Sequence, residues 1–195
     1  VKLKAIDAKD MTQAHIESRR QVREMDEFFR KYVPGFEESY VLSTAPLMGI
    51  RESRKIEGEY VLTGDDVVGA AKFPDAVAKS SANVDIHNPI GEGYVHWFEK
   101  EMEDGSIAKL RIPKGEYYEI PYRCMVPKKV DGLLVTGRCI SSTHEGQSAF
   151  RLVGTCMDLG EASGIAGAMA VKMGITPRSI DGRLISQLSY GKRKI

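Results

Sequence analysis

The sequence predicts an α+β or mixed α/β fold, with a central antiparallel or mixed sheet and flanking helices. A long amphipathic helical pattern lies near the N-terminus, and a helical pattern rich in small residues lies near the C-terminus. Short apolar or alternating segments fill the middle of the chain. With 195 residues, the chain can bury a hydrophobic core of its own. We expect two parts: residues 1–130, mainly β structure after the first helix, and residues 131–195.

The first helix is predicted over residues 10–32, because apolar and small side chains recur there at alternating spacings of three and four. Asp10 is expected to cap this helix, with Gln13 reaching back to it as in a capping box. Pro34-Gly35 is expected to end it. The opposite face is charged, which is typical of a helix face in contact with solvent.

The middle of the chain is predicted to be mostly β structure. Short apolar or alternating runs between turn residues predict strands or hairpins at residues 40–42, 56–62, 84–86, 94–116 and 117–120. Residues 122–126 lie between two prolines and are expected to be extended. Two short helices are expected, at residues 64–71 with acidic residues in the first turn, and at residues 74–79 with a proline at the first position.

Residues 133–170 carry the most informative pattern. An apolar run at residues 133–135 predicts a buried strand, Gly137 breaks it, and a polar loop follows at residues 141–148. A helix is predicted from Thr155 onward. Glycine inside a helix costs about 1 kcal/mol relative to alanine, so its repeated small residues indicate close packing of another backbone or of a flat ligand. Such a unit presents the free N–H groups of a helix N-terminus to an anionic ligand.

The composition argues against several classes of protein. A net charge of +1 gives no general electrostatic basis for binding nucleic acid or an anionic membrane. No apolar run reaches the roughly 18 residues that a membrane helix needs, and no secretory signal pattern opens the chain. The three cysteines, Cys124, Cys139 and Cys156, are odd in number and widely spaced, which argues against a disulfide framework. We therefore expect a cytoplasmic protein that binds neither nucleic acid nor membranes.

Four blocks of sequence together resemble a known family. They are GIRESRKIEG at residues 49–58, YEIPYRCMVP at 118–127, LLVTGRCISSTHE at 133–145 and RLVGTCMDLGEASGIA at 151–166. In this order they resemble the C-terminal part of FAD-dependent oxidoreductases of the xanthan-lyase-like type, which share the glutathione-reductase type of FAD fold. The resemblance implies a piece of a two-domain flavoprotein, with residues 131–195 as the closing strand, loop and helix of its FAD-binding domain.

One motif of such flavoproteins is absent from the sequence. They begin with a strand, a G-x-G-x-x-G turn and a helix that hold the FAD pyrophosphate. The G-x-G at residues 91–93 is followed by an aromatic segment instead. We therefore expect a fragment that binds little or no FAD by itself. Its expected partners are a small-molecule substrate and either a second copy of the chain or a missing N-terminal segment.

The resemblance also implies which residues contact FAD. Gly137 and Arg138 would contact its ribityl and pyrophosphate part through the backbone, where a glycine allows close approach. Thr155, Cys156 and Met157 would aim the N–H groups of a helix N-terminus at the flavin pyrimidine, where they stabilise negative charge on the reduced ring.

Three further residues are implied for catalysis. His144 would give or take a proton near the flavin, and Arg151 would hold an anionic group of the substrate. Arg51 would contact the substrate or form a structural ion pair. From residue type alone, His144 is equally compatible with a loop histidine bonded to backbone, and Arg151 with an arginine paired to a local acid.

Other interpretations follow from residue types. No metal site is expected, because the cysteines and histidines lack C-x-x-C or H-x-x-x-H spacing. A thiol enzyme would use Cys139 or Cys156 with His144, and Cys156 at a helix N-terminus would have a lowered pKa. A third interpretation is a non-enzymatic, stand-alone module that associates with another chain.

Overall fold

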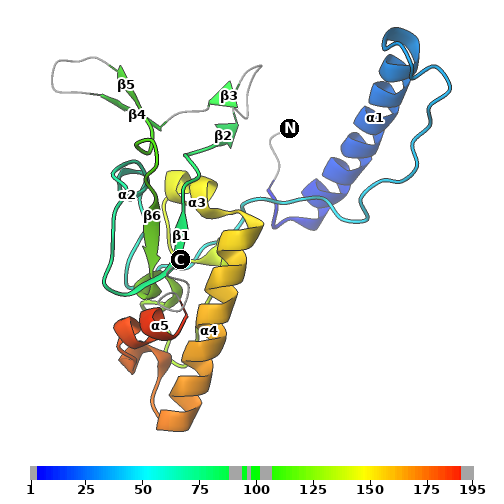
Figure 1. The fold of residues 1–195 in the computed structure, drawn as a ribbon. Coiled ribbons are helices and arrows are strands. Elements are labelled where there is room, and N and C mark those ends of the chain that lie inside the picture. Colours follow the sequence, from blue (N-terminus) through cyan, green and yellow to red (C-terminus); the bar gives the residue numbers. More distant parts are fainter. Residues whose placement is uncertain (1–3, 88–93, 96–97, 102–106, 190–195) are drawn as a thin grey trace. The chain divides into compact units, whose positions relative to one another are not determined.

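The structure confirms the predicted α+β class (Figure 1). The computed structural model describes residues 4–87, 94–95, 98–101 and 107–189. Within these residues, five α-helices accompany six strands that pair antiparallel. The chain divides into two compact units, Val1–Ser53 and Arg54–Ile195. The assignment of residues 1–130 and 131–195 to two functional domains stays a prediction.

The first unit consists of α1 (Ala8–Tyr32) and the segment after it. The side chain of Asp7 caps the helix by accepting a hydrogen bond from the backbone N–H of Asp10 at 3.1 Å. The predicted cap by Asp10 and Gln13 is therefore wrong, because Asp7 already satisfies a free N–H group at this end. Within the described part of this unit, Ala14 is the only apolar side chain that is buried.

The second unit is built around β1 (Ala76–Ser80) and β6 (Tyr118–Pro121), which pair antiparallel. Ala78 lies opposite Ile120, and both are fully buried. The helix predicted at residues 74–79 is wrong. Pairing with β6 buries the apolar side chains of β1 and satisfies its backbone groups, and this tertiary gain overrides a weak local helical preference.

Two helices cover this sheet in the second unit. α4 (Val153–Met173) packs against β1, and α5 (Gly182–Leu188) packs against both β1 and α4 (Figure 1). The buried side of α4 includes Leu159, Ala162 and Ala166, at spacings of three and four. The helix predicted from Thr155 onward is confirmed, with its start two residues earlier.

Two further strand pairs belong to the second unit. β2 (Ile86–His87) pairs with β3 (Tyr94–Val95), and β4 (Phe98–Glu101) pairs with β5 (Ile107–Leu110). These pairs confirm β structure near the predicted strand and meander, parts of which lie outside the described residues.

Some short predicted elements are confirmed and others are not. The strand predicted at 117–120 corresponds to β6, and α2 (Gly64–Val68) confirms the first short helix. The segment at 122–126 is instead a 3-10 helix, η1 (Tyr122–Met125). Residues 40–42 form no strand, and residues 56–62 make only single bridges to the rest of the unit. An alternating pattern predicts a strand only where a partner strand is available.

The stretch after residue 133 differs most from its predicted form. Residues 133–135 are irregular, Leu133 is 46% exposed, and the chain turns at Gly137 (φ +69°) into η2 (Gly137–Cys139). The polar loop predicted at 141–148 contains a helix, α3 (His144–Phe150), which Thr143 caps. The predicted buried strand is wrong, because here the chain is anchored by single hydrogen bonds such as that from Val135 N to Met125 O.

Candidate active site at the start of α4

A cleft of about 520 Å³ lies in the second unit between the end of β1 and the first turn of α4. Its lining consists of Lys79, Ser80, Ser81, Gly115, Glu116, Tyr117, Gly154, Thr155 and Asp158. Small and hydroxyl side chains therefore face each other across it, with charged groups at its margins. The packing of α4 on β1 brings these two distant parts of the sequence together.

The N-terminus of α4 lacks a side-chain cap. Its N-cap residue is Leu152, which has no polar atom to accept a hydrogen bond from the first turn. An added Cβ at Gly154 would meet nothing within 4 Å, so the backbone is accessible there. The free N–H groups and the positive end of the helix dipole therefore remain available to an acceptor in the cleft.

Thr155 contributes an unpartnered hydroxyl to the same cleft. The residue is only 6% exposed, and among the described residues its hydroxyl has no hydrogen-bond partner. By contrast, the Thr12 hydroxyl in α1 donates to the Ala8 carbonyl at 2.8 Å, which is usual for threonine in a helix. A buried polar group without a partner costs about 1–3 kcal/mol. The hydroxyl of Thr155 therefore indicates a ligand that supplies the missing hydrogen bond.

The opposite wall of the cleft carries cations and hydroxyl groups. The Nζ atoms of Lys72 and Lys79 lie 3.5 and 5.4 Å from the ring centroid of Tyr117, within the range of cation–π interaction. Ser80 is buried, and its hydroxyl accepts a hydrogen bond from Ala82 N at 3.2 Å. The wall is therefore polar and well ordered, and it can contact a planar ligand with several acceptor atoms.

Two hydrogen bonds tie the chain beyond β1 to the junction of α3 and α4. Arg151 donates from Nη2 to the Asp85 carbonyl at 2.7 Å, and the Asp85 N–H donates to Ser148 Oγ at 3.2 Å. Ser148 Oγ in turn donates to the Glu145 carbonyl at 2.7 Å. Both backbone groups of Asp85 are thus held by α3 and its C-cap, just before the start of α4 and just before β2.

Comparison with known families agrees with this arrangement. The family model for FAD dependent oxidoreductases matches residues 1–189. The chain belongs to the FAD dependent oxidoreductase family. No curated protein and no solved structure matches it. The family match confirms the predicted flavoprotein class, so the cleft at the start of α4 is best examined as a flavin site.

The residues predicted to contact FAD in this family member are distributed around the start of α4. Gly137 and Arg138 lie in η2, which packs against α4. Thr155 lines the cleft, Cys156 is partly buried beside it in sequence, and Met157 is 69% exposed. Gly137 needs its left-handed backbone to turn the chain, since other residues are strained at φ +69°. Direct contact of these residues with FAD stays a prediction.

The residues predicted for catalysis are less closely grouped. Arg151 uses its guanidinium to hold Asp85, as described above. His144 is the exposed first residue of α3 and does not line the cleft. Arg51 is exposed and belongs to the first unit. The catalytic roles of all three stay predictions.

The expected lowering of the Cys156 pKa is wrong. Partial burial raises the pKa of this thiol, although the nearby Arg138 guanidinium acts in the opposite direction and Cys139 adds to the increase. Desolvation of the thiolate outweighs the helix N-terminus here. This argues against Cys156 as the activated nucleophile of a thiol enzyme.

Lys79, Ser80, Ser81 and Asp158 were not predicted as site residues. The first three belong to or follow β1, which the sequence had predicted as a helix. Two adjacent serines directly after a buried apolar run were the available signal. Asp158 is one turn from Thr155 on α4, so helical spacing alone could have linked the two.

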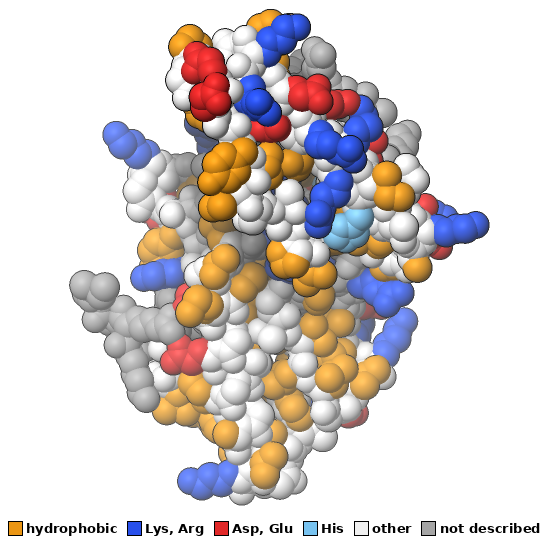
Figure 2. Space-filling view, turned by 90° about the vertical axis from the view of Figure 1, so that its right-hand side faces the viewer, with side chains coloured by type: hydrophobic (Ala, Val, Ile, Leu, Met, Phe, Trp, Pro, Cys, Tyr) orange, Lys and Arg blue, Asp and Glu red, His pale blue; other side chains and the backbone are white. Residues whose placement is uncertain are grey.

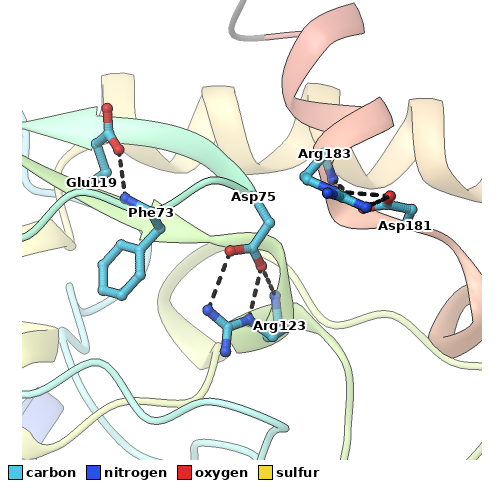
Figure 3. A network of polar contacts seen from close by, with 6 residues as sticks. All are labelled: Phe73, Asp75, Glu119, Arg123, Asp181 and Arg183. Carbon is cyan, nitrogen blue, oxygen red and sulfur yellow. Dashed lines mark hydrogen bonds and ion pairs between the residues drawn. The ribbon is translucent and has the colours of Figure 1, made fainter.

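A second cleft, of about 720 Å³, lies between η1 and the start of α5. Its arginines are all paired with acids: Arg123 with Asp75, Arg178 with Glu59 and Asp131, and Arg183 with Asp181. Figure 3 shows Arg123 clamped on Asp75, and Asp181 beside Arg183 at the start of α5. The ion pair with Asp75 raises the pKa of Arg123 further. Since these charges balance one another, this cleft joins elements and is the weaker candidate for a site.

Two other features were searched in the described residues. No three His, Cys, Asp or Glu side chains there are grouped so that they could hold a metal ion. No helix among those residues is long and apolar enough to cross a membrane.

Proposed function

We propose that the protein contributes the α4 side of the flavin site in an FAD-dependent oxidoreductase. The observation that carries the proposal is the uncapped N-terminus of α4 beside the buried, unpartnered hydroxyl of Thr155. Both offer hydrogen bonds to a ligand rich in acceptor atoms, and the pyrimidine edge of a flavin has such atoms. When bound, FAD would carry the redox chemistry as a hydride acceptor or donor.

The chain's own residues would hold and polarise that edge. The N–H groups of residues 153–155 and the Thr155 hydroxyl would donate to it, and the positive end of the α4 dipole would favour negative charge there. Gly137 and Arg138 would approach the ribityl and pyrophosphate part through the backbone. This deeper assignment, to the C-terminal part of a xanthan-lyase-like flavoprotein of the glutathione-reductase type, is supported by the four sequence blocks.

The substrate side would be formed by the chain beyond β1. Arg151 and Ser148 hold Asp85 there, and a small-molecule substrate would lie on this side of the ring. His144 would serve in proton transfer, and Arg51 would contact an anionic part of the substrate. We infer a cytoplasmic enzyme, in agreement with the absence of signal sequences from the given chain.

A second candidate function is a non-enzymatic module that associates with another chain. It is favoured by the side of α4 that is exposed within the second unit. An added Cβ at Gly160, Gly164 or Gly167 would meet nothing within 4 Å. Val153 and Val171 on the same helix are highly exposed, and hydrophobic side chains are spread over the surface in Figure 2. Such a module would not need a flavin.

The test is chemical-shift mapping by NMR, which detects weak binding. Uniformly labelled protein is titrated with FMN and with FAD. We expect selective shifts at the amides of Ser80, Ser81, Gly154 and Thr155, with FAD binding no more tightly than FMN because the sequence lacks a pyrophosphate-binding glycine loop. Absence of these shifts at millimolar flavin would favour the stand-alone module.

A matched pair of variants tests the role of the hydroxyl. Thr155→Val removes one hydrogen bond and should weaken FMN binding roughly threefold to tenfold, the equivalent of about 0.5–1.5 kcal/mol. Ser163→Ala removes a hydroxyl from the same helix, where it bonds only to the Gly160 carbonyl, and should leave the affinity unchanged. Equal effects of the two substitutions would contradict the proposed site.

A further inference from the structure

Two of the three cysteines lie on elements that pack against each other. Cys139 is the exposed last residue of η2, and Cys156 is partly buried in the first turn of α4. η2 packs against α4. The third cysteine, Cys124, is fully buried in η1 and belongs to the hydrophobic core.

The backbone around Cys139 is fixed, while its thiol is open to solvent. The left-handed turn at Gly137 directs η2 onto α4, and the Cys139 carbonyl accepts a hydrogen bond from Ile56 N at 3.0 Å. An oxidant can therefore reach Cys139 without unfolding. Cys156 is shielded by comparison, which suits a thiol that reacts second.

Charges also act across this contact. The thiol of Cys139 and the guanidinium of Arg138 both influence the protonation of Cys156, which is possible only for close neighbours because electrostatic effects fall with distance. Arg138 favours the thiolate, the form that reacts. Cys124 is separated from this cluster by its complete burial.

We propose that Cys139 and Cys156 form a reversible thiol pair, which a hydroperoxide oxidises to a disulfide between η2 and α4. The Cys139 thiolate attacks a peroxide oxygen, the O–O bond breaks, and Cys139 becomes a sulfenic acid. The Cys156 thiolate then attacks the Cys139 sulfur, the S–O bond breaks, and the hydroxide that leaves takes up a proton to become water. With hydrogen peroxide, two thiols and one peroxide yield one disulfide and two waters.

The consequence would be structural control of the α4 N-terminus. The disulfide would fasten the turn at Gly137 and Arg138 to the first turn of α4, next to Thr155. This inference goes beyond the proposed function and does not depend on it, since the thiol pair can be tested without a flavin.

The sequence makes the test direct. Trypsin cleaves after Arg123, Arg138 and Arg151, so each cysteine falls in a different peptide. The full chain is treated with hydrogen peroxide, free thiols are blocked with N-ethylmaleimide, and unreduced peptides are identified by mass spectrometry. We expect a cross-linked product of the Cys139 and Cys156 peptides that dithiothreitol abolishes and that persists on dilution, as an intramolecular bond requires.

Three variants complete the test. Cys139→Ser and Cys156→Ser should each abolish the product, whereas Cys124→Ser should leave its yield unchanged if the variant folds. Because burial raises the pKa of Cys156, the disulfide should form faster as the pH rises from about 7 to about 9. Over-oxidation of Cys139 while Cys156 stays free, or cross-linking that disappears on dilution, would overturn the proposal. These outcomes appear in the unsubstituted chain, so they do not depend on the folding of a variant.

Discussion

Thr155 and Thr12 are both helical threonines, and only their surroundings separate a candidate ligand contact from an ordinary helical residue. The Thr12 hydroxyl bonds to the preceding turn, whereas that of Thr155 is buried without a partner. The sequence indicated Thr155 through its place near a helix start. It could not indicate that Leu152 leaves this end uncapped or that Ser80 lies across the cleft, because these depend on distant segments.

Asp75 provides a prediction about a single ion pair. Its carboxylate is almost fully buried and accepts two hydrogen bonds from the guanidinium of Arg123, at 3.0 and 3.2 Å. Arg123 is about half exposed, so solvent screens part of the interaction. Asp75→Ala should lower the free energy of unfolding by about 1–3 kcal/mol in urea denaturation. Arg183→Ala breaks the exposed pair with Asp181 and should change it by less than about 0.5 kcal/mol; similar effects would contradict the difference in burial.

Arg151 allows a prediction that separates stability from turnover. Arg151→Met removes the hydrogen bond to the Asp85 carbonyl and should destabilise the protein by about 1–2 kcal/mol, since the donor is charged. The amides near Asp85 should then exchange hydrogen faster. Arg151→Lys keeps a donor and should restore most of this stability. If the guanidinium also binds substrate, the lysine variant will still turn over slowly; unchanged amide exchange in Arg151→Met would show that the hydrogen bond is unimportant.

At the scale of elements, glycines in two neighbouring helices have opposite surroundings. A Cβ at Gly146 in α3 would lie 2.4 Å from the Leu62 carbonyl oxygen, whereas a Cβ at Gly164 in α4 would meet nothing within 4 Å. The sequence predicted close packing for the glycines of the α4 helix. Within this chain the close approach occurs at Gly146 instead, because α3 lies against the backbone at Leu62.

This contrast gives a paired prediction. Gly146→Ala should destabilise the protein by roughly 1–3 kcal/mol or more, because backbone must move to admit the methyl group. Gly164→Ala should stabilise it by up to about 1 kcal/mol, since alanine favours the helix and nothing opposes it. Thermal unfolding of both variants checks the pair. A destabilising Gly164→Ala would mean that something covers this side of α4 in solution.

β1 shows why short elements escape prediction. The segment from Pro74 to Lys79 has a proline suited to the first turn of a helix, and no local signal contradicts a helix. β6 lies about forty residues further along the sequence, and only pairing with it makes the segment a strand. Long elements are less exposed to such effects, and α1 and α4 were both predicted to within two residues.

At the scale of the whole molecule, the two units differ in how much they bury. The first has Ala14 as its only buried apolar side chain among described residues, whereas the second has a continuous core from Leu62 to Ile185. Local opening is easiest where few apolar contacts are made. In native-state hydrogen exchange, amides in α1 should therefore exchange faster than those in the middle of α4. Equal protection would show that the apolar side of α1 is covered in solution.

The sequence by itself determined the α+β class, the two long helices and, through four ordered blocks, the FAD dependent oxidoreductase family that the family match confirms. These rest on local periodicity and on motifs, which a single chain carries in full. Tertiary structure alone decided that residues 76–80 form a strand, that Ser80 faces Thr155, and that Cys139 lies by Cys156. Each of these depends on contacts between residues far apart in sequence, whose free energy no local pattern encodes.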